Sequence, residues 1–153
     1  MFGIPIFVCA LLASGSSALA QLNHSVPAYG QSAKHCSERT LIGDYGFVAE
    51  GALLPAPGVS LQFGSVGMAH FDGNGNLTWI EHTVIAGVLQ GPGFGTTATG
   101  TYNLDPDCTG TAVVNTPNSS TPLNLGLVIV KQGSEFHTVL DTHAITSVFT
   151  KVD

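Results

Sequence analysis

A predicted β-hairpin decides the fold, and its sequence is LQFGSVGMAHFDGNGNLTWIEHTVIAG, residues 61–87. Two runs rich in apolar and β-branched residues, 61–72 and 76–87, flank the cluster Asp72–Gly75. Glycine and asparagine accept the positive backbone φ angles that tight hairpin turns require. Because strands joined by so short a link must be antiparallel, this stretch predicts an antiparallel pair of β-strands.

The same pattern continues along the rest of the chain. Apolar runs alternate with clusters of Gly, Pro, Asn and Asp, and no segment after residue 20 keeps a helical period over three turns. Short links at 105–107, 133–134 and 141–144 predict further antiparallel neighbours, and Gly133-Ser134 fits a two-residue type II′ turn. The predicted strands are 42–52, 61–72, 76–87, 95–104, 108–115, 123–132, 135–142 and 145–152.

Eight successive antiparallel strands leave two exposed sheet edges unless the sheet closes on itself. Open edges are an aggregation hazard, and a closed barrel removes them. Glycines inside the predicted strands would permit the sharp bends of a small barrel. The sequence therefore predicts an all-β fold, an eight-stranded antiparallel up-and-down barrel, with a β-sandwich as the alternative. A barrel of this size is filled by side chains or holds one small ligand.

The first twenty residues are predicted to be a signal peptide. Residues 2–13 are almost continuously apolar, and a Ser/Gly cluster and Ala18-Leu19-Ala20 follow. This order matches an apolar core followed by a small-residue cleavage site. Cleavage after Ala20 predicts a secreted or periplasmic protein without a stable membrane anchor. An uncleaved anchor is the alternative. Residues 21–40 are polar and irregular and are predicted to form a flexible leader before a single domain at 41–153.

Composition excludes some function classes. The chain has 153 residues, of which 9% are charged, and its net charge is −6. A surface with so few cations is poorly suited to phosphate backbones, so no nucleic acid partner is expected. No cofactor motif is present: the Gly-rich segment 91–95 lacks the lysine and the helix of a phosphate-binding loop. The sequence carries no signal for an oligomeric state.

Two cysteines remain after the predicted cleavage, Cys36 and Cys108. In an oxidising compartment an even, small number of cysteines most simply forms a disulfide. Two free thiols, with Cys108 as a nucleophile, are the alternative.

Two motifs carry a resemblance to known proteins. They are Leu41-Ile42-Gly43-Asp44-Tyr45-Gly46-Phe47 and the segment GTYNLDPDCTGT at 100–111. This pattern resembles a group of uncharacterised secreted bacterial proteins. The architecture resembles the eight-stranded calycin-like barrels, in particular those of the allene oxide cyclase and dirigent type. The resemblance covers residues 36–153 and implies a barrel with an apolar pocket, but it places no catalytic residue.

The predicted hairpin supplies candidate ligand-binding residues. With a two-residue loop at Gly73-Asn74, Met68 faces Trp79, Val66 faces Glu81 and His70 faces Leu77. One face would then carry the only tryptophan and a carboxylate among apolar groups, which is typical of a pocket wall. Inside a barrel, desolvation would raise the pKa of Glu81 and fit it for acid–base chemistry. The alternative places Glu81 in water at the strand end and Trp79 in the core.

Histidines give a weaker pattern. His137, Asp141 and His143 share one face of the predicted strand 135–142 or follow it. Adjacent positions on this face could bind a metal ion if a third ligand came from elsewhere. The opposite face carries Phe136 and Leu140 and looks more like core. His137 and Asp141 are therefore interpreted as the solvent face, and no metal site is predicted.

Three function hypotheses follow. The first is a non-enzymatic barrel that binds a small apolar molecule, or has a structural surface role, with Met68, Trp79, Glu81 and Tyr102 as candidate ligand-binding residues. The second is a cofactor-free isomerase or cyclase in the same pocket, with Glu81 or Tyr102 as the polar group. The third is a cell-envelope or adhesion module that uses exposed strands or loops.

Overall fold

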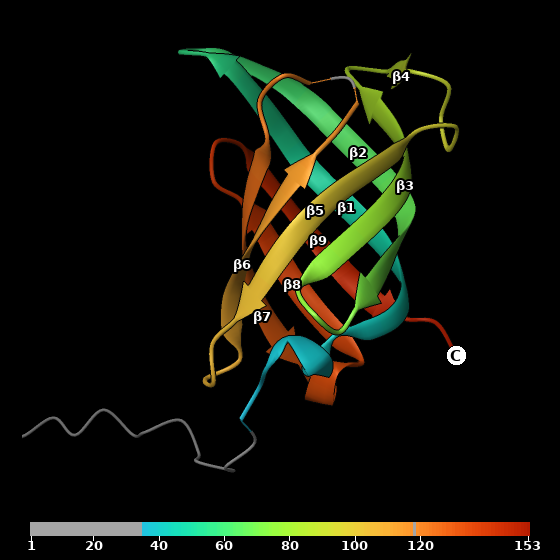
Figure 1. Cartoon of the computed structure of the whole chain (residues 1–153). Helices are drawn as coiled ribbons and strands as arrows, with labels where there is room; N and C mark the ends of the chain where they lie inside the picture. Colours follow the sequence, from blue (N-terminus) through green and yellow to red (C-terminus); the bar gives the residue numbers. More distant parts are fainter. Residues whose placement is uncertain (1–34, 118) are drawn as a thin grey trace, which may run out of the picture. The chain divides into compact units, whose positions relative to one another are not determined.

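The computed structural model describes residues 35–117 and 119–153 (Figure 1). The predicted signal peptide and residues 21–34 of the predicted leader lie outside this part of the chain. The described residues form one antiparallel sheet and two short 3-10 helices, η1 (Glu38–Thr40) and η2 (Lys131–Gly133). The strands are β1 (Ile42–Ala56), β2 (Val59–Asp72), β3 (Asn76–Ile85), β4 (Val88–Gln90), β5 (Thr97–Leu104), β6 (Thr109–Asn115), β7 (Leu123–Val130), β8 (Glu135–Leu140) and β9 (Ala144–Lys151).

The sheet closes into a barrel. Strand order is β2-β1-β9-β8-β7-β6-β5-β3-β4, and an additional pairing joins β2 to β3. Eight strands thus form a closed antiparallel ring, and β4 is an extra strand that pairs with β3 alone. The predicted up-and-down barrel is confirmed, and the sandwich alternative is wrong.

The strand boundaries differ from the predicted ones at two turns. Ala86 and Gly87 have φ angles of 48° and 82°, which end β3 and start the hairpin to β4, so the predicted strand 76–87 is too long. The predicted two-residue turn at Gly133-Ser134 is also wrong. The strand β7 ends at Val130, and η2 makes the turn with three successive positive φ angles, including 90° at Gly133.

The register of the β2–β3 hairpin is shifted by one residue from the prediction. Phe71 pairs with Leu77, Ala69 with Trp79 and Gly67 with Glu81. The loop has three residues because the Asp72 carboxylate accepts hydrogen bonds from the backbone N–H groups of Asn74 and Asn76, at 2.7 and 2.9 Å. A one-residue shift turns every side chain of a strand to the other face. The predicted pairing of Met68 with Trp79 is therefore wrong.

One end of the barrel is closed by a plug, which we define as Cys36–Leu41 together with the side chains beneath it. The disulfide Cys36–Cys108 ties this segment to the turn before β6, as predicted. The Tyr102 hydroxyl donates to the carbonyl of Leu41 at 2.9 Å and lies 2.8 Å from that of Glu38. Residues 36–40 of the predicted leader are thus hydrogen-bonded to the barrel (Figure 1, lower end).

An aromatic layer fills the barrel above the plug. Phe136 and Phe149 stack with their ring centroids 4.4 Å apart, and Phe71 packs edge-on against Phe136 at 5.3 Å. Tyr45 is fully buried and its hydroxyl donates to the carbonyl of Gly133 at 2.7 Å. Since this half is packed with large side chains, any ligand space must lie toward the opposite end.

Candidate functional site

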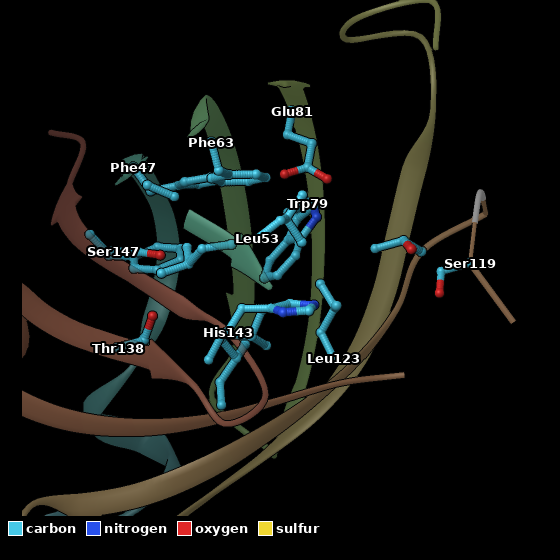
Figure 2. Close-up of a pocket in the computed structure, with 16 residues that line it drawn as sticks. Phe47, Leu53, Phe63, Trp79, Glu81, Ser119, Leu123, Thr138, His143 and Ser147 are labelled. Carbon is cyan, nitrogen blue, oxygen red and sulfur yellow. The ribbon is translucent and has the colours of Figure 1, made fainter. Parts of the chain in front are cut away.

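A cavity of about 270 Å³ occupies the end of the barrel opposite the plug (Figure 2). The side chains around it come from six strands, β1, β2, β3, β7, β8 and β9. Thr116, Ser119 and His143 add side chains from outside the strands. All of these segments meet at one end of an up-and-down barrel, because successive strands alternate in direction. The apolar members are Phe47, Ala49, Leu53, Phe63, Trp79, Leu123, Leu125, Leu140, Ile145 and Phe149.

Aromatic rings form much of the cavity wall. Phe47 lies between Trp79 and Phe149, with ring centroids 5.7 and 4.8 Å away. Phe63 also lines the cavity, and Figure 2 shows its ring close to Glu81 and Trp79. Such a wall offers a large contact area to a flat apolar molecule.

Glu81 places a carboxyl group in this apolar wall. Its Oε2 accepts a hydrogen bond from the Ser65 hydroxyl at 3.2 Å, and Ser65 Oγ lies 2.8 Å from Thr83 Oγ1. Burial raises the pKa of Glu81, because the charged form is desolvated. The hydroxyls of Ser65 and Thr83 and the indole of Trp79 lower that pKa, but by less than burial raises it. The cavity therefore holds a carboxyl group that favours its neutral form more than an exposed glutamate does.

Two buried polar atoms at the cavity have no hydrogen-bond partner among the described residues. They are Trp79 Nε1 and Thr138 Oγ1, and both side chains are 7% exposed. The indole nitrogen lies on the side of the ring that faces the Glu81 carboxylate (Figure 2), close enough to lower the pKa of Glu81 but outside hydrogen-bond geometry. Thr138 pairs with Ser147 of β9, and both side chains line the cavity. A buried polar group without a partner is uncommon and costs about 1–3 kcal/mol.

The rim of the cavity includes His143, from the loop between β8 and β9. Its Nδ1 accepts a hydrogen bond from the backbone N–H of Leu54 at 3.2 Å, which ties this loop to the β1 end. The sequence placed His143 with His137 and Asp141. In the described part of the chain, no group of three or more His, Cys, Asp or Glu residues is arranged to hold a metal ion.

The predicted site residues separate into two sets. Trp79 and Glu81 both line the cavity. Met68 lies on the outer face of the barrel, 39% exposed, because of the shifted register. Tyr102 lies in the plug and does not line this cavity.

Sequence reasoning missed several members of the cavity wall. Phe63 lies on β2, the hairpin partner of β3, and Phe47 lies on β1, on the far side of β2. Thr138 and Ser147 come from strands far from Trp79 in sequence, and only the closed topology brings them to it. A signal was present for Thr138, since it alternates with His137 and shares a face with Phe136 and Leu140.

No known family model and no curated protein sequence matches this chain. Among residues 35–117 and 119–153, no helix has the length and apolar character needed to cross a membrane. The physical chemistry of the cavity carries the functional argument.

Proposed function

We propose that this protein binds a small apolar molecule in the cavity at the open end of the barrel. The observation that carries the proposal is the pair of unpartnered polar atoms, Trp79 Nε1 and Thr138 Oγ1, in a wall that is otherwise mostly apolar. Ligand sites typically combine such a wall with a few polar groups that fix orientation.

The packing of the two barrel ends supports this reading. The plug end is filled by large rings such as Phe71 and Phe136, which shows that this barrel geometry can be packed solid. At the other end about 270 Å³ stays open between Leu53, Leu125 and Ile145. An apolar cavity of about 150 Å³ can hold benzene, so this space suits a molecule of about two fused rings.

Calorimetric titration with 2-methylnaphthalene tests the proposal. We expect binding to the wild type and a large loss in Ser147→Leu, since the added side chain occupies the cavity. Thr146→Leu is the matched control, because Thr146 is exposed on the outer face of the same strand. Equal binding by both variants, or no binding by the wild type, would overturn the proposal.

Glu81 supports a second candidate, a cofactor-free isomerase or cyclase. A carboxyl group with a raised pKa beside an apolar cavity can transfer a proton at moderate pH. On this reading Glu81→Gln abolishes turnover of a bound substrate and leaves its affinity intact. Turnover that survives in Glu81→Gln would exclude the enzymatic role of this group.

Export belongs to the same proposal. The apolar segment at 2–13, the cleavage pattern ending at Ala20 and the disulfide Cys36–Cys108 all fit a protein that folds in an oxidising compartment. Mass spectrometry of the exported chain should give a first residue of Gln21. A chain that keeps residues 1–20 would contradict cleavage. The eight-stranded barrel supports the resemblance to calycin-like proteins, and membership of the uncharacterised secreted family is proposed on that resemblance.

A further inference from the structure

The polar groups of the cavity restrict the chemistry of its ligand beyond size and apolarity. Trp79 Nε1 is a donor only, so a ligand group that bonds to it must be an acceptor. Glu81 lies beside it and, when ionised, only accepts hydrogen bonds. While Glu81 is ionised, a ligand group that satisfies both side chains must accept one hydrogen bond and donate another.

Other common polar groups fit this pair less well. A primary ammonium donates hydrogen bonds and accepts none, so it would leave the Trp79 N–H without a partner. A carboxylate would place a second negative charge beside Glu81, and like charges in a desolvated site repel. A ketone or ether accepts from Trp79 but offers Glu81 no proton. A hydroxyl group does both.

We infer that the cavity takes an uncharged molecule with a compact apolar body and a hydroxyl group, an alcohol or a phenol, and that this hydroxyl accepts from Trp79 Nε1 and donates to Glu81. This inference rests on the proposed function, because it concerns the same cavity. The rings of Phe47 and Phe63 contact the apolar body. Thr138 lies on β8, where it pairs with Ser147 of β9, and its hydroxyl offers a second hydrogen bond to a ligand that carries another oxygen.

Three probes with one skeleton test the inference. They are 2-methylnaphthalene, 2-naphthylmethanol and 2-naphthylmethylammonium, and their dissociation constants can be measured by calorimetry at neutral pH. We expect the alcohol to bind about tenfold more tightly than the hydrocarbon, because a hydrogen bond to a buried partner contributes on this scale. The ammonium should bind more weakly than the alcohol.

Each departure from this order has a distinct meaning. If the hydrocarbon binds as tightly as the alcohol, the cavity binds apolar molecules and the hydroxyl inference is wrong. If the ammonium binds most tightly, Glu81 with its surrounding rings recognises cations, and the hydroxyl inference is again wrong. If none of the three probes binds, the proposed function is wrong as well.

Two variants test whether the preference for the alcohol depends on the N–H group of Trp79. In Trp79→Phe the preference for the alcohol over the hydrocarbon should fall, because the bond from the indole N–H is lost and only the bond to Glu81 remains. The ratio of the two affinities cancels the change in cavity volume. Phe63→Leu is the control, since it alters the same wall without removing a polar group and should keep the preference. An unchanged preference in Trp79→Phe would overturn the inference.

A measurement on the unmodified protein keeps the test independent of mutant folding. Trp79 is the only tryptophan, so the chain has a single indole N–H resonance in a ¹H–¹⁵N spectrum. We expect the alcohol to move this proton downfield, as a new hydrogen bond does, relative to the complex with the hydrocarbon. Identical indole shifts in the two complexes would contradict a bond to Trp79.

Discussion

The ring of Phe47 lies against Gly67 of the neighbouring strand, where an added Cβ would come within 2.5 Å of the ring atoms Cε1 and Cζ. Gly67 also pairs with Glu81 on its other side, and the same Cβ would overlap the carbonyl oxygen of Ile80. The missing side chain at Gly67 thus creates the space in which Phe47 packs between Trp79 and Phe149.

Gly67→Ala should therefore disturb both stability and ligand binding. Overpacking of a filled interior costs about 1–3 kcal/mol, and we expect this loss in the free energy of unfolding, measured with urea. A displaced Phe47 should also weaken the binding of 2-methylnaphthalene. Gly64→Ala is the control on the same strand, because an added Cβ there meets nothing within 4 Å. Equal stability of the two variants would contradict the packing argument.

Glu81 should make the protein less stable as pH rises. A glutamate in an unfolded chain titrates near pH ~4.3, and burial raises the pKa of Glu81 in the folded state. Between these two values the folded state binds more protons than the unfolded state, so stability falls as pH increases through this window. Glu81→Gln cannot ionise and should be more stable than the wild type at neutral pH.

The difference between the two unfolding curves isolates this effect. Hydrogen bonds lower the pKa values of Asp72, Asp107 and Glu135 in the folded state. The stability that these carboxylates contribute is lost as pH falls through those pKa values, and this loss is the same in the wild type and in Glu81→Gln. The advantage of Glu81→Gln should vanish below about pH 4, where Glu81 is protonated in both states. Glu50→Gln removes a carboxyl group from an exposed site and is the control substitution.

Thr138→Val should stabilise the ligand-free protein. The substitution keeps the shape of the side chain and removes a buried hydroxyl that has no partner among the described residues. We expect a gain of about 1 kcal/mol in the free energy of unfolding. Thr146→Val removes an exposed hydroxyl from the next strand and should change stability by less than about 0.5 kcal/mol. A loss of stability in Thr138→Val would show that its hydroxyl has a partner in solution.

Tyr102→Phe should affect stability and leave ligand binding unchanged. The hydroxyl of Tyr102 holds the carbonyls of Leu41 and Glu38 in the plug. Its removal leaves a buried carbonyl without this donor, and we expect a cost of about 1–2 kcal/mol in thermal or urea unfolding. The affinity for 2-methylnaphthalene should stay within error of the wild type. A reduced affinity would place Tyr102 in the binding site after all.

The sequence predicts the barrel well because turn residues mark the ends of most of its strands. Alternation of apolar residues and the turns at Asp72 and Pro106 give seven of the eight barrel strands within about two residues at most ends. The three-residue loop after Asp72 escapes this reasoning, because the carboxylate that fixes it makes hydrogen bonds which composition does not reveal. The one extra residue in this loop decides which face of β2 points into the barrel.

The sequence predicts only those residues of the candidate site that are close together in the chain. Trp79 and Glu81 lie two residues apart on one strand, so their common face follows from the pleat alone. Other residues of the wall, such as Thr138 and Ser147, are far from Trp79 in sequence and reach it only through ring closure. Tyr102 has the chemistry of a pocket residue, but the strand direction places it at the plug.

The plug makes the barrel a cup rather than a tunnel. Leu41 and the disulfide at Cys36 close the base of the barrel. A ligand must therefore enter and leave at the opposite end, past the loop that is hydrogen-bonded through His143 to Leu54. Residence time should then depend on how often this rim opens. A homologous series of guests with growing tails should reach a plateau in affinity once the base is occupied, because each further methylene would stay in water at the rim.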